Sequence, residues 1–128
     1  MNTLLLMALL YGPYQARVIE VIDGDTLLLN VAVWPGQVNR ARIGVAGVDT
    51  PELHGACDSE RLMAREARDF SRGFVGNKVR VEKLRQSKTG KLYAEIRNTD
   101  GRPLAEALIN ARYGVPFVRG RKHDWCPH

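Results

Sequence analysis

The sequence predicts a small β-barrel with two helices, an α+β fold built as one domain. Three observations support this prediction. The chain has 128 residues, which is enough for one hydrophobic core. Short segments with the period of two that is typical of strands occur in two groups, three before a helical segment and two after it. Tight turns rich in glycine separate these segments, and five short strands joined in this way favour a closed barrel.

The first three strands are predicted to form an antiparallel meander. Residues 15–22 alternate in polarity and are rich in β-branched side chains, and residues 26–33 follow an Asp-Gly-Asp turn. After a second turn at residues 34–37, the third strand spans residues 39–48. Gly44 and Gly47 predict a bend or a bulge within it.

The rest of the chain predicts two helices and two strands. The first helix begins at Asp58 or Ser59, either of which can cap it, and ends at Gly76. Its apolar face repeats at helical spacing and comprises Met63, Ala67, Phe70 and Phe74. Residues 78–84 and 91–96 are predicted strands, and a second helix runs from about Pro103 to Gly114. The order βββαββα indicates a five-stranded barrel of the oligonucleotide- and oligosaccharide-binding (OB) type, which alone does not define a function.

Two end segments flank the predicted barrel domain of residues 15–118. Residues 1–14 are apolar, but they lack the basic start and the small-residue cleavage site of an export signal. An unrecognised export signal and a segment that packs on the body or mediates self-association both stay open. Residues 119–128 form a basic tail. No stretch reaches the roughly 20 apolar residues of a membrane span, so we expect no stable membrane insertion.

The composition favours a globular protein with a polyanionic partner. Hydrophobic residues make up 45% of the chain and charged residues 26%, which excludes a disordered or fibrous protein. Nineteen Lys and Arg against fourteen Asp and Glu give a net charge of +5. Basic side chains gather in the last predicted hairpin, where solvated strand edges are the alternative to a nucleic-acid surface. The candidate contacts are Arg85, Lys88 and Lys91, with Tyr93 and Tyr113 for base stacking or for packing.

The two cysteines leave three alternatives open. Cys57 and Cys126 could form a disulfide, remain free thiols, or bind zinc together with His54, His123 and His128. A disulfide would indicate a periplasmic or secreted protein, whereas free thiols are compatible with the cytoplasm.

Two acidic clusters carry the candidate chemistry. The DGDT segment at 23–26 occupies the turn between the first two strands, and the DTPE segment at 49–52 follows the third. Because these strands are neighbours in a meander, we expect the clusters to converge at one rim. Asp25 and Asp49 would then present two carboxylates to Ca²⁺, and Glu52 could activate water as a general base. Either cluster alone is more typical of a simple turn or a helix start.

The segments VIDGDT at 21–26 and VDTPE at 48–52 resemble the staphylococcal nuclease-like (thermonuclease) family, as do KTGK at 88–91 and DGR at 100–102. The likeness covers about residues 17–117. It implies an OB barrel and Ca²⁺-dependent hydrolysis of phosphodiester bonds in DNA and RNA. It also implies that Asp25 and Asp49 are metal ligands, that the carbonyl oxygen of Thr50 is a third ligand, and that Glu52 is the proposed general base.

Two positions depart from the family pattern. Active members carry an arginine five residues before the second metal aspartate, where this chain has Gly44, and another after the glycine of the last hairpin, where it has Lys91. Such arginines grip the phosphate and stabilise the charge of the transition state. Lys91 keeps the charge without the bidentate geometry. Arg42, on the same strand face as Gly44, could replace the missing arginine or remain a solvated residue.

From these observations we expect a weakened Ca²⁺-dependent nuclease that prefers single-stranded nucleic acid. Its catalytic residues would be Glu52 and Lys91, with Arg42 as a candidate replacement. A nucleic-acid-binding module of the same fold that has lost the reaction is the alternative.

Overall fold

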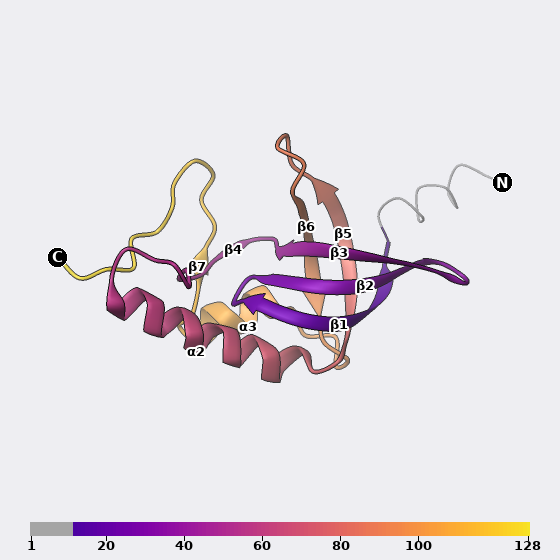
Figure 1. Ribbon diagram of the computed structural model, residues 1–128, viewed down its shortest axis with the longest axis horizontal. Helices are drawn as coiled ribbons and strands as arrows, with labels where there is room; N and C mark the ends of the chain where they lie inside the picture. The colour runs from indigo at the N-terminus through magenta and orange to yellow at the C-terminus, as the bar shows by residue number, and fades with distance from the viewer. Residues whose placement is uncertain (1–11) are drawn as a thin grey trace.

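The computed structural model describes residues 12–128 and shows a closed five-stranded barrel flanked by two helices (Figure 1). The barrel strands pair in the order β1-β2-β3-β6-β5, and β5 pairs with β1 to close it. All these pairs are antiparallel except β3 with β6, which is parallel. The strands are β1 (Tyr14–Asp23), β2 (Thr26–Trp34), β3 (Gln37–Val45), β5 (Lys78–Gln86) and β6 (Leu92–Arg97). The predicted OB-like barrel with helices is therefore confirmed.

The interior of the barrel is filled by aliphatic side chains from alternate strand positions. Leu27 and Leu29 of β2, Ile43 of β3, Val81 of β5 and Ile96 of β6 are all fully buried. Of the apolar segment predicted at residues 1–14, residues 1–11 lie outside the described part of the chain, and Tyr14 begins β1. Within residues 12–128, no helix is long and apolar enough to cross a membrane.

The predicted third strand is two separate strands. Gly47 has a φ of 86°, which favours glycine, and it turns the chain between β3 and β4 (Val48–Asp49). β4 leaves the barrel and pairs with β7 (Val115–Pro116), a short strand that the sequence did not predict. Gly114 permits this approach, because a Cβ atom there would lie 2.5 Å from Cγ2 of Val48. The pairing fixes Asp49, the first residue of the second acidic cluster.

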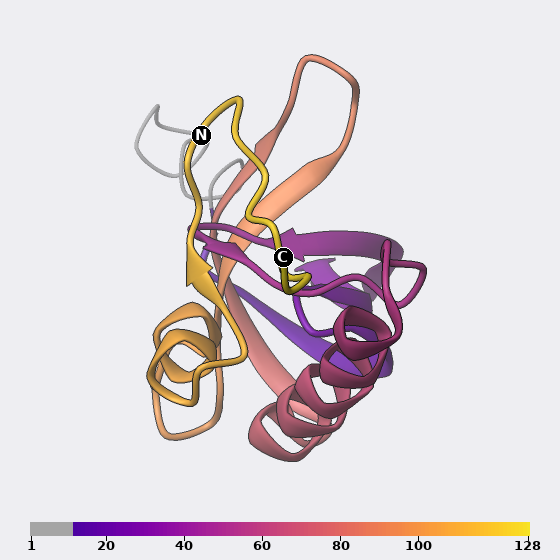
Figure 2. The same cartoon turned by 90° about the vertical axis from the view of Figure 1, so that its left-hand side faces the viewer.

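The first helix, α2 (Asp58–Val75), lies along the barrel beside β1 (Figures 1 and 2). Its N-cap residue is Cys57, so the predicted caps Asp58 and Ser59 are wrong, whereas its predicted end at Gly76 is confirmed. Of the predicted apolar face, Ala67 is fully buried and Phe70 and Phe74 pack against the core. The buried positions of α2 also include some that were not predicted: Glu60, Ala64, Ser71 and Val75.

The second helix, α3 (Leu104–Asn110), packs against β6 and α2. It ends at Asn110 rather than near Gly114. Arg112 has a φ of 66°, which a continuing helix does not allow. The early end leaves room for the chain to turn into β7.

Candidate active site

An open cleft of about 1310 Å³ brings the two acidic clusters together. It exceeds the roughly 300–1,000 Å³ of most small-molecule pockets. The clusters contribute Asp23, Asp25, Thr26, Asp49, Thr50 and Glu52 to its lining. Both predicted segments therefore line the same cleft.

The turn that carries Asp25 is anchored on helix α2. Ser71 donates a buried hydrogen bond from Oγ to the carbonyl oxygen of Gly24, at 2.7 Å. A Cβ atom on Gly24 would lie 3.0 Å from Cβ of Ala67, so a side chain there would press on the helix. The N–H of Asp25 donates to Oδ1 of Asp23 at 3.2 Å, an arrangement typical of a tight turn. The position of Asp25 is thus set by both the barrel and α2.

The carboxyl group of Asp25 is unusually hard to ionise. Burial, together with the hydrogen bond and the negative charge of Asp23, raises the pKa of Asp25 to about 8. The nearby hydroxyls of Thr50 and Thr26 act in the opposite direction. Thr26 donates to Oδ1 of Asp25 at 3.3 Å, whereas Thr50 Oγ1 is buried and makes no hydrogen bond of normal geometry within the described residues. A bound cation would stabilise ionised Asp25 beside Asp23.

The donor set suits a hard cation such as Ca²⁺, which takes carboxylate, main-chain carbonyl and water oxygens. Asp25, Asp49 and the carbonyl oxygen of Thr50 are the candidate ligands, and all three residues line the cleft. Across residues 12–128, one set of three His, Cys, Asp or Glu side chains brings its ligand atoms within 4.8 Å of one another: Cys57, Glu60 and Cys126. Its two sulfurs are joined in a disulfide. A Ca²⁺ site in the cleft would therefore rely on main-chain oxygen and water beside the two carboxylates.

A buried glutamate supports the loop that carries Glu52. Glu60 is 6% exposed, and its two carboxylate oxygens accept hydrogen bonds from the backbone N–H groups of Glu52 and Ala56, each at 3.1 Å. Gly55 leaves the space for this side chain, since a Cβ atom there would lie 2.3 Å from Cδ of Glu60. The sequence analysis missed Glu60. Its position three residues after the N-cap Cys57, where a capping box has Glu, was the available signal.

The two cysteines form a disulfide that holds the C-terminal tail, residues 119–128, at the start of α2. The Cα atoms of Cys57 and Cys126 are 6.1 Å apart. Of the three alternatives, the disulfide is the one the structure contains. The zinc site with His54, His123 and His128 is wrong, because no thiolate remains to bind the metal.

The tail meets both acidic residues of the second cluster. The backbone N–H of His123 donates to Oδ2 of Asp49 at 2.8 Å, and Lys122 Nζ forms an ion pair with Oε1 of Glu52. Desolvation lowers the pKa of Lys122, but the hydrogen bond and charge of Glu52 and the charges of Asp49 and Glu60 outweigh it and raise the pKa. Lys122 is therefore a cationic residue of the site that the sequence analysis did not single out.

Only some of the residues predicted to contact nucleic acid line the cleft. Arg85, Lys91 and Tyr93 line it, whereas Lys88 is exposed and does not. Tyr113 lies elsewhere and packs against Phe70, with 5.6 Å between ring centroids, which is the packing role left open above.

Position 44 is closed by an aromatic ring. A Cβ atom on Gly44 would lie 2.8 Å from two ring atoms of Tyr93, so the space that an arginine would need is occupied. Arg42, the candidate replacement, is exposed opposite Leu28 of β2 and does not line the cleft. The structure does not bring Arg42 to the acidic clusters.

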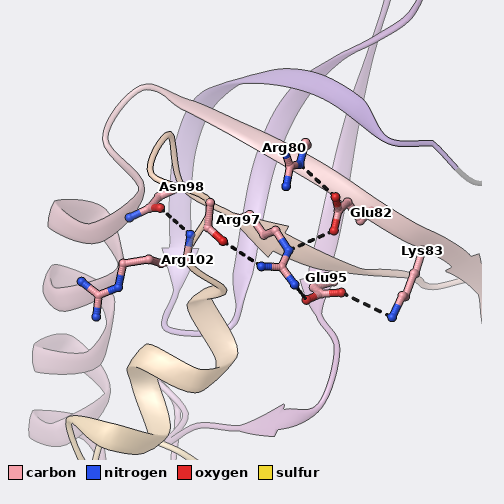
Figure 3. Close-up of polar contacts among 8 residues, drawn as sticks. Arg80, Glu82, Lys83, Glu95, Arg97, Asn98 and Arg102 are labelled. Atoms are coloured by element: carbon pink, nitrogen blue, oxygen red, sulfur yellow. Dashed lines mark hydrogen bonds and ion pairs between the residues drawn. The ribbon is translucent and has the colours of Figure 1, made fainter.

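Arg97 links the two strands of the β5–β6 hairpin through the acidic side chains Glu82 and Glu95 (Figure 3). Its guanidinium group bonds Glu82 at 2.9 Å, Glu95 at 2.5 Å and the carbonyl oxygen of Gly101 at 2.7 Å. This side chain joins both strands of the hairpin to the turn before α3. Arg97 therefore has a structural role, and its charge is already paired.

Comparisons with known proteins add no assignment: no family model matches this chain, and no curated protein matches it. The fold and the cleft together define an OB-like barrel with an acidic centre and basic side chains around it.

Proposed function

We propose that this chain is a Ca²⁺-dependent nuclease that hydrolyses phosphodiester bonds in DNA or RNA. The observation that carries the proposal is the convergence of three distant segments on one open cleft: the DGDT turn, the DTPE segment and the basic hairpin of β5 and β6. This reaction requires carboxylates that bind a cation, a carboxylate that acts as a base, and cationic groups that bind the phosphate. The resemblance to the staphylococcal nuclease-like family supports the same activity.

In this proposal Asp25, Asp49 and the carbonyl oxygen of Thr50 hold Ca²⁺, which polarises the phosphate when bound. Glu52 takes a proton from the attacking water at a carboxylate oxygen, so that the water oxygen can bond to phosphorus while the bond from phosphorus to the sugar oxygen breaks and that oxygen takes up a proton from solvent water. Arg85 and Lys91 bind the non-bridging phosphate oxygens. Tyr93 offers a ring face to an unpaired base, which favours single-stranded substrates.

The disulfide supports an oxidising compartment for this nuclease, and hence a periplasmic or secreted protein.

The proposal is tested by cleavage of denatured DNA in the presence of Ca²⁺ and of a chelator. We expect cleavage with Ca²⁺, its loss with chelator, and at least a hundredfold lower rate for Glu52→Gln, as is typical for loss of a general base. Glu66→Gln is the matched control, because Glu66 is exposed on α2 and does not line the cleft. Cleavage that is indifferent to chelator, or an unimpaired Glu52→Gln variant, would contradict the proposal.

One observation favours a second candidate, a nucleic-acid-binding module without catalysis. The arginine position of active family members is Gly44 here, and the ring of Tyr93 fills its place. The module predicts binding of single strands that weakens with salt, without cleavage under any metal condition. The cleavage assay and a salt titration of binding separate the two.

A further inference from the structure

The wall of the cleft formed by β3 provides no cation beside the acidic clusters. Gly44 has no side chain, and the Tyr93 ring occupies the space where one would begin. Arg42 is exposed and lies outside the lining of the cleft. Lys91 and Arg85 belong to the β5–β6 hairpin, a different wall. Besides these two cations, the C-terminal tail contributes three to the lining of the cleft: Arg119, Arg121 and Lys122.

Lys122 of the C-terminal tail lies next to the groups between which a phosphate would bind. Its ammonium group pairs with Glu52, and the N–H of the following residue, His123, donates to Asp49. The candidate base and a candidate metal ligand are thus both in contact with this part of the tail. We propose that Lys122 binds the substrate phosphate and supplies the charge stabilisation that Gly44 cannot, a role that rests on the proposed nuclease function.

The disulfide helps to hold Lys122 at the cleft, together with the hydrogen bond from His123 to Asp49. Cys126 joins the tail to Cys57, the N-cap residue of α2, and the tail ends beside the start of this helix (Figure 1). Glu60, in the first turn of the same helix, holds the loop that carries Glu52. Lys122 and Glu52 are therefore connected to the same helix end, Lys122 through the disulfide and Glu52 through Glu60. Cys57 and Cys126 are positioning residues that act through Lys122.

The contact between Lys122 and Glu52 does not close the site. The side chains are 53% and 55% exposed, and ion pairs exposed to this degree contribute little to stability. An arriving phosphate oxygen can replace Glu52 as the partner of the ammonium group. This exchange frees the carboxylate of Glu52 to accept a proton. An inhibitory tail would instead keep Glu52 bound to Lys122. In that case, removing the Lys122 side chain would raise the cleavage rate instead of lowering it.

The test compares kcat and KM for Ca²⁺-dependent cleavage of denatured DNA by four proteins: wild type, Lys122→Ala, Lys122→Arg and Arg40→Ala. We expect Lys122→Ala to lower kcat on the order of 10²–10³-fold, the usual effect of losing one donor to the transition state. Lys122→Arg should restore most of the rate because it keeps the charge. Arg40→Ala should behave as wild type, since Arg40 is exposed and outside the cleft. An unchanged or increased kcat for Lys122→Ala would overturn the proposal.

The role of the disulfide is tested with the Cys57→Ser/Cys126→Ser variant. We expect it to lose as much activity as Lys122→Ala, and we expect no further loss when the three substitutions are combined, because they remove the same interaction. Losses that multiply would show that the cysteines act independently of Lys122. Circular dichroism melting establishes that the serine variant is folded, and the single substitutions of Lys122 test the phosphate contact in any case.

The outcomes also separate this inference from the proposed function. If wild type binds denatured DNA without cleaving it, Lys122→Ala should reduce the slope of log affinity against log salt by about 0.7, the value for one lost phosphate contact. An unchanged slope would refute the contact. An active wild type with an indifferent Lys122 refutes this inference alone, whereas a wild type that neither binds nor cleaves nucleic acid refutes the proposed function with it.

Discussion

Replacing Asp25 with asparagine should change how the stability of the protein depends on pH. The pKa of Asp25 is raised from 3.8 in the unfolded chain to about 8 in the metal-free fold, mainly by burial. Between these values the folded protein holds a proton that the unfolded chain has lost. The free energy of unfolding must therefore fall as the pH rises from about 4 to about 8. The slope is at most about 1.4 kcal/mol for each pH unit. Asparagine cannot ionise, so the variant should lose this slope.

Urea denaturation at pH 5, 6, 7 and 8 in the presence of chelator measures the effect. Between pH 5 and pH 7 we expect wild type to lose roughly 2–3 kcal/mol relative to Asp25→Asn. Asp100→Asn is the control, because Asp100 is exposed in the turn before α3 and should keep the wild-type profile. At pH 7, Ca²⁺ at a hundred times its Kd should stabilise wild type by about 2.7 kcal/mol and should have little effect on Asp25→Asn. Parallel pH profiles for wild type and Asp25→Asn would refute the reasoning.

Three further substitutions test the supports of the site. Gly114→Ala should cost about 1–3 kcal/mol in urea denaturation, because the new methyl group collides with Val48 and disturbs β4, and an unchanged midpoint would contradict this. Glu60→Gln should cost about 1–3 kcal/mol in the same assay through its weakened bonds to two backbone N–H groups, and it should lower the cleavage rate; a neutral result would contradict the role of Glu60. Arg42→Ala should leave the rate of DNA cleavage unchanged, since Arg42 is exposed and outside the cleft, and a large loss would show that it reaches the phosphate.

The barrel was predictable because its signals are local. Alternating polarity and Asp-Gly turns define β1 and β2 directly, and Gly76 marks the end of α2. The separation of β4 from β3 was not predictable to the residue, because it depends on the pairing of β4 with β7. That pairing joins segments more than 60 residues apart and requires Gly114 at the contact. Two-residue strands have too little pattern of their own to be found in a sequence.

That both acidic segments line one cleft was also predictable, because Asp25 follows β1 and Asp49 comes just after β3, and these two strands of the meander end at the same rim. The supporting residues were not. Lys122 reaches Glu52 across a separation of 70 residues, and its position depends on a disulfide that was one of three alternatives. The sequence also could not show that Arg42 lies outside the cleft. Strand alternation places Arg42 on the same strand face as Gly44, but it does not reveal that the ring of Tyr93 covers Gly44.

The central claim is that the DGDT turn and the DTPE segment form one cation site. Isothermal titration of the disulfide-bonded protein with Ca²⁺ tests it most directly, with wild type, Asp25→Asn and Asp49→Asn compared at pH 7 and with Asp100→Asn as the control. We predict one Ca²⁺ per chain for wild type and for the control, and loss of this binding in both site variants, because each carboxylate comes from a different segment of the same site. Undiminished Ca²⁺ binding in both site variants, or no binding by wild type, would contradict the account.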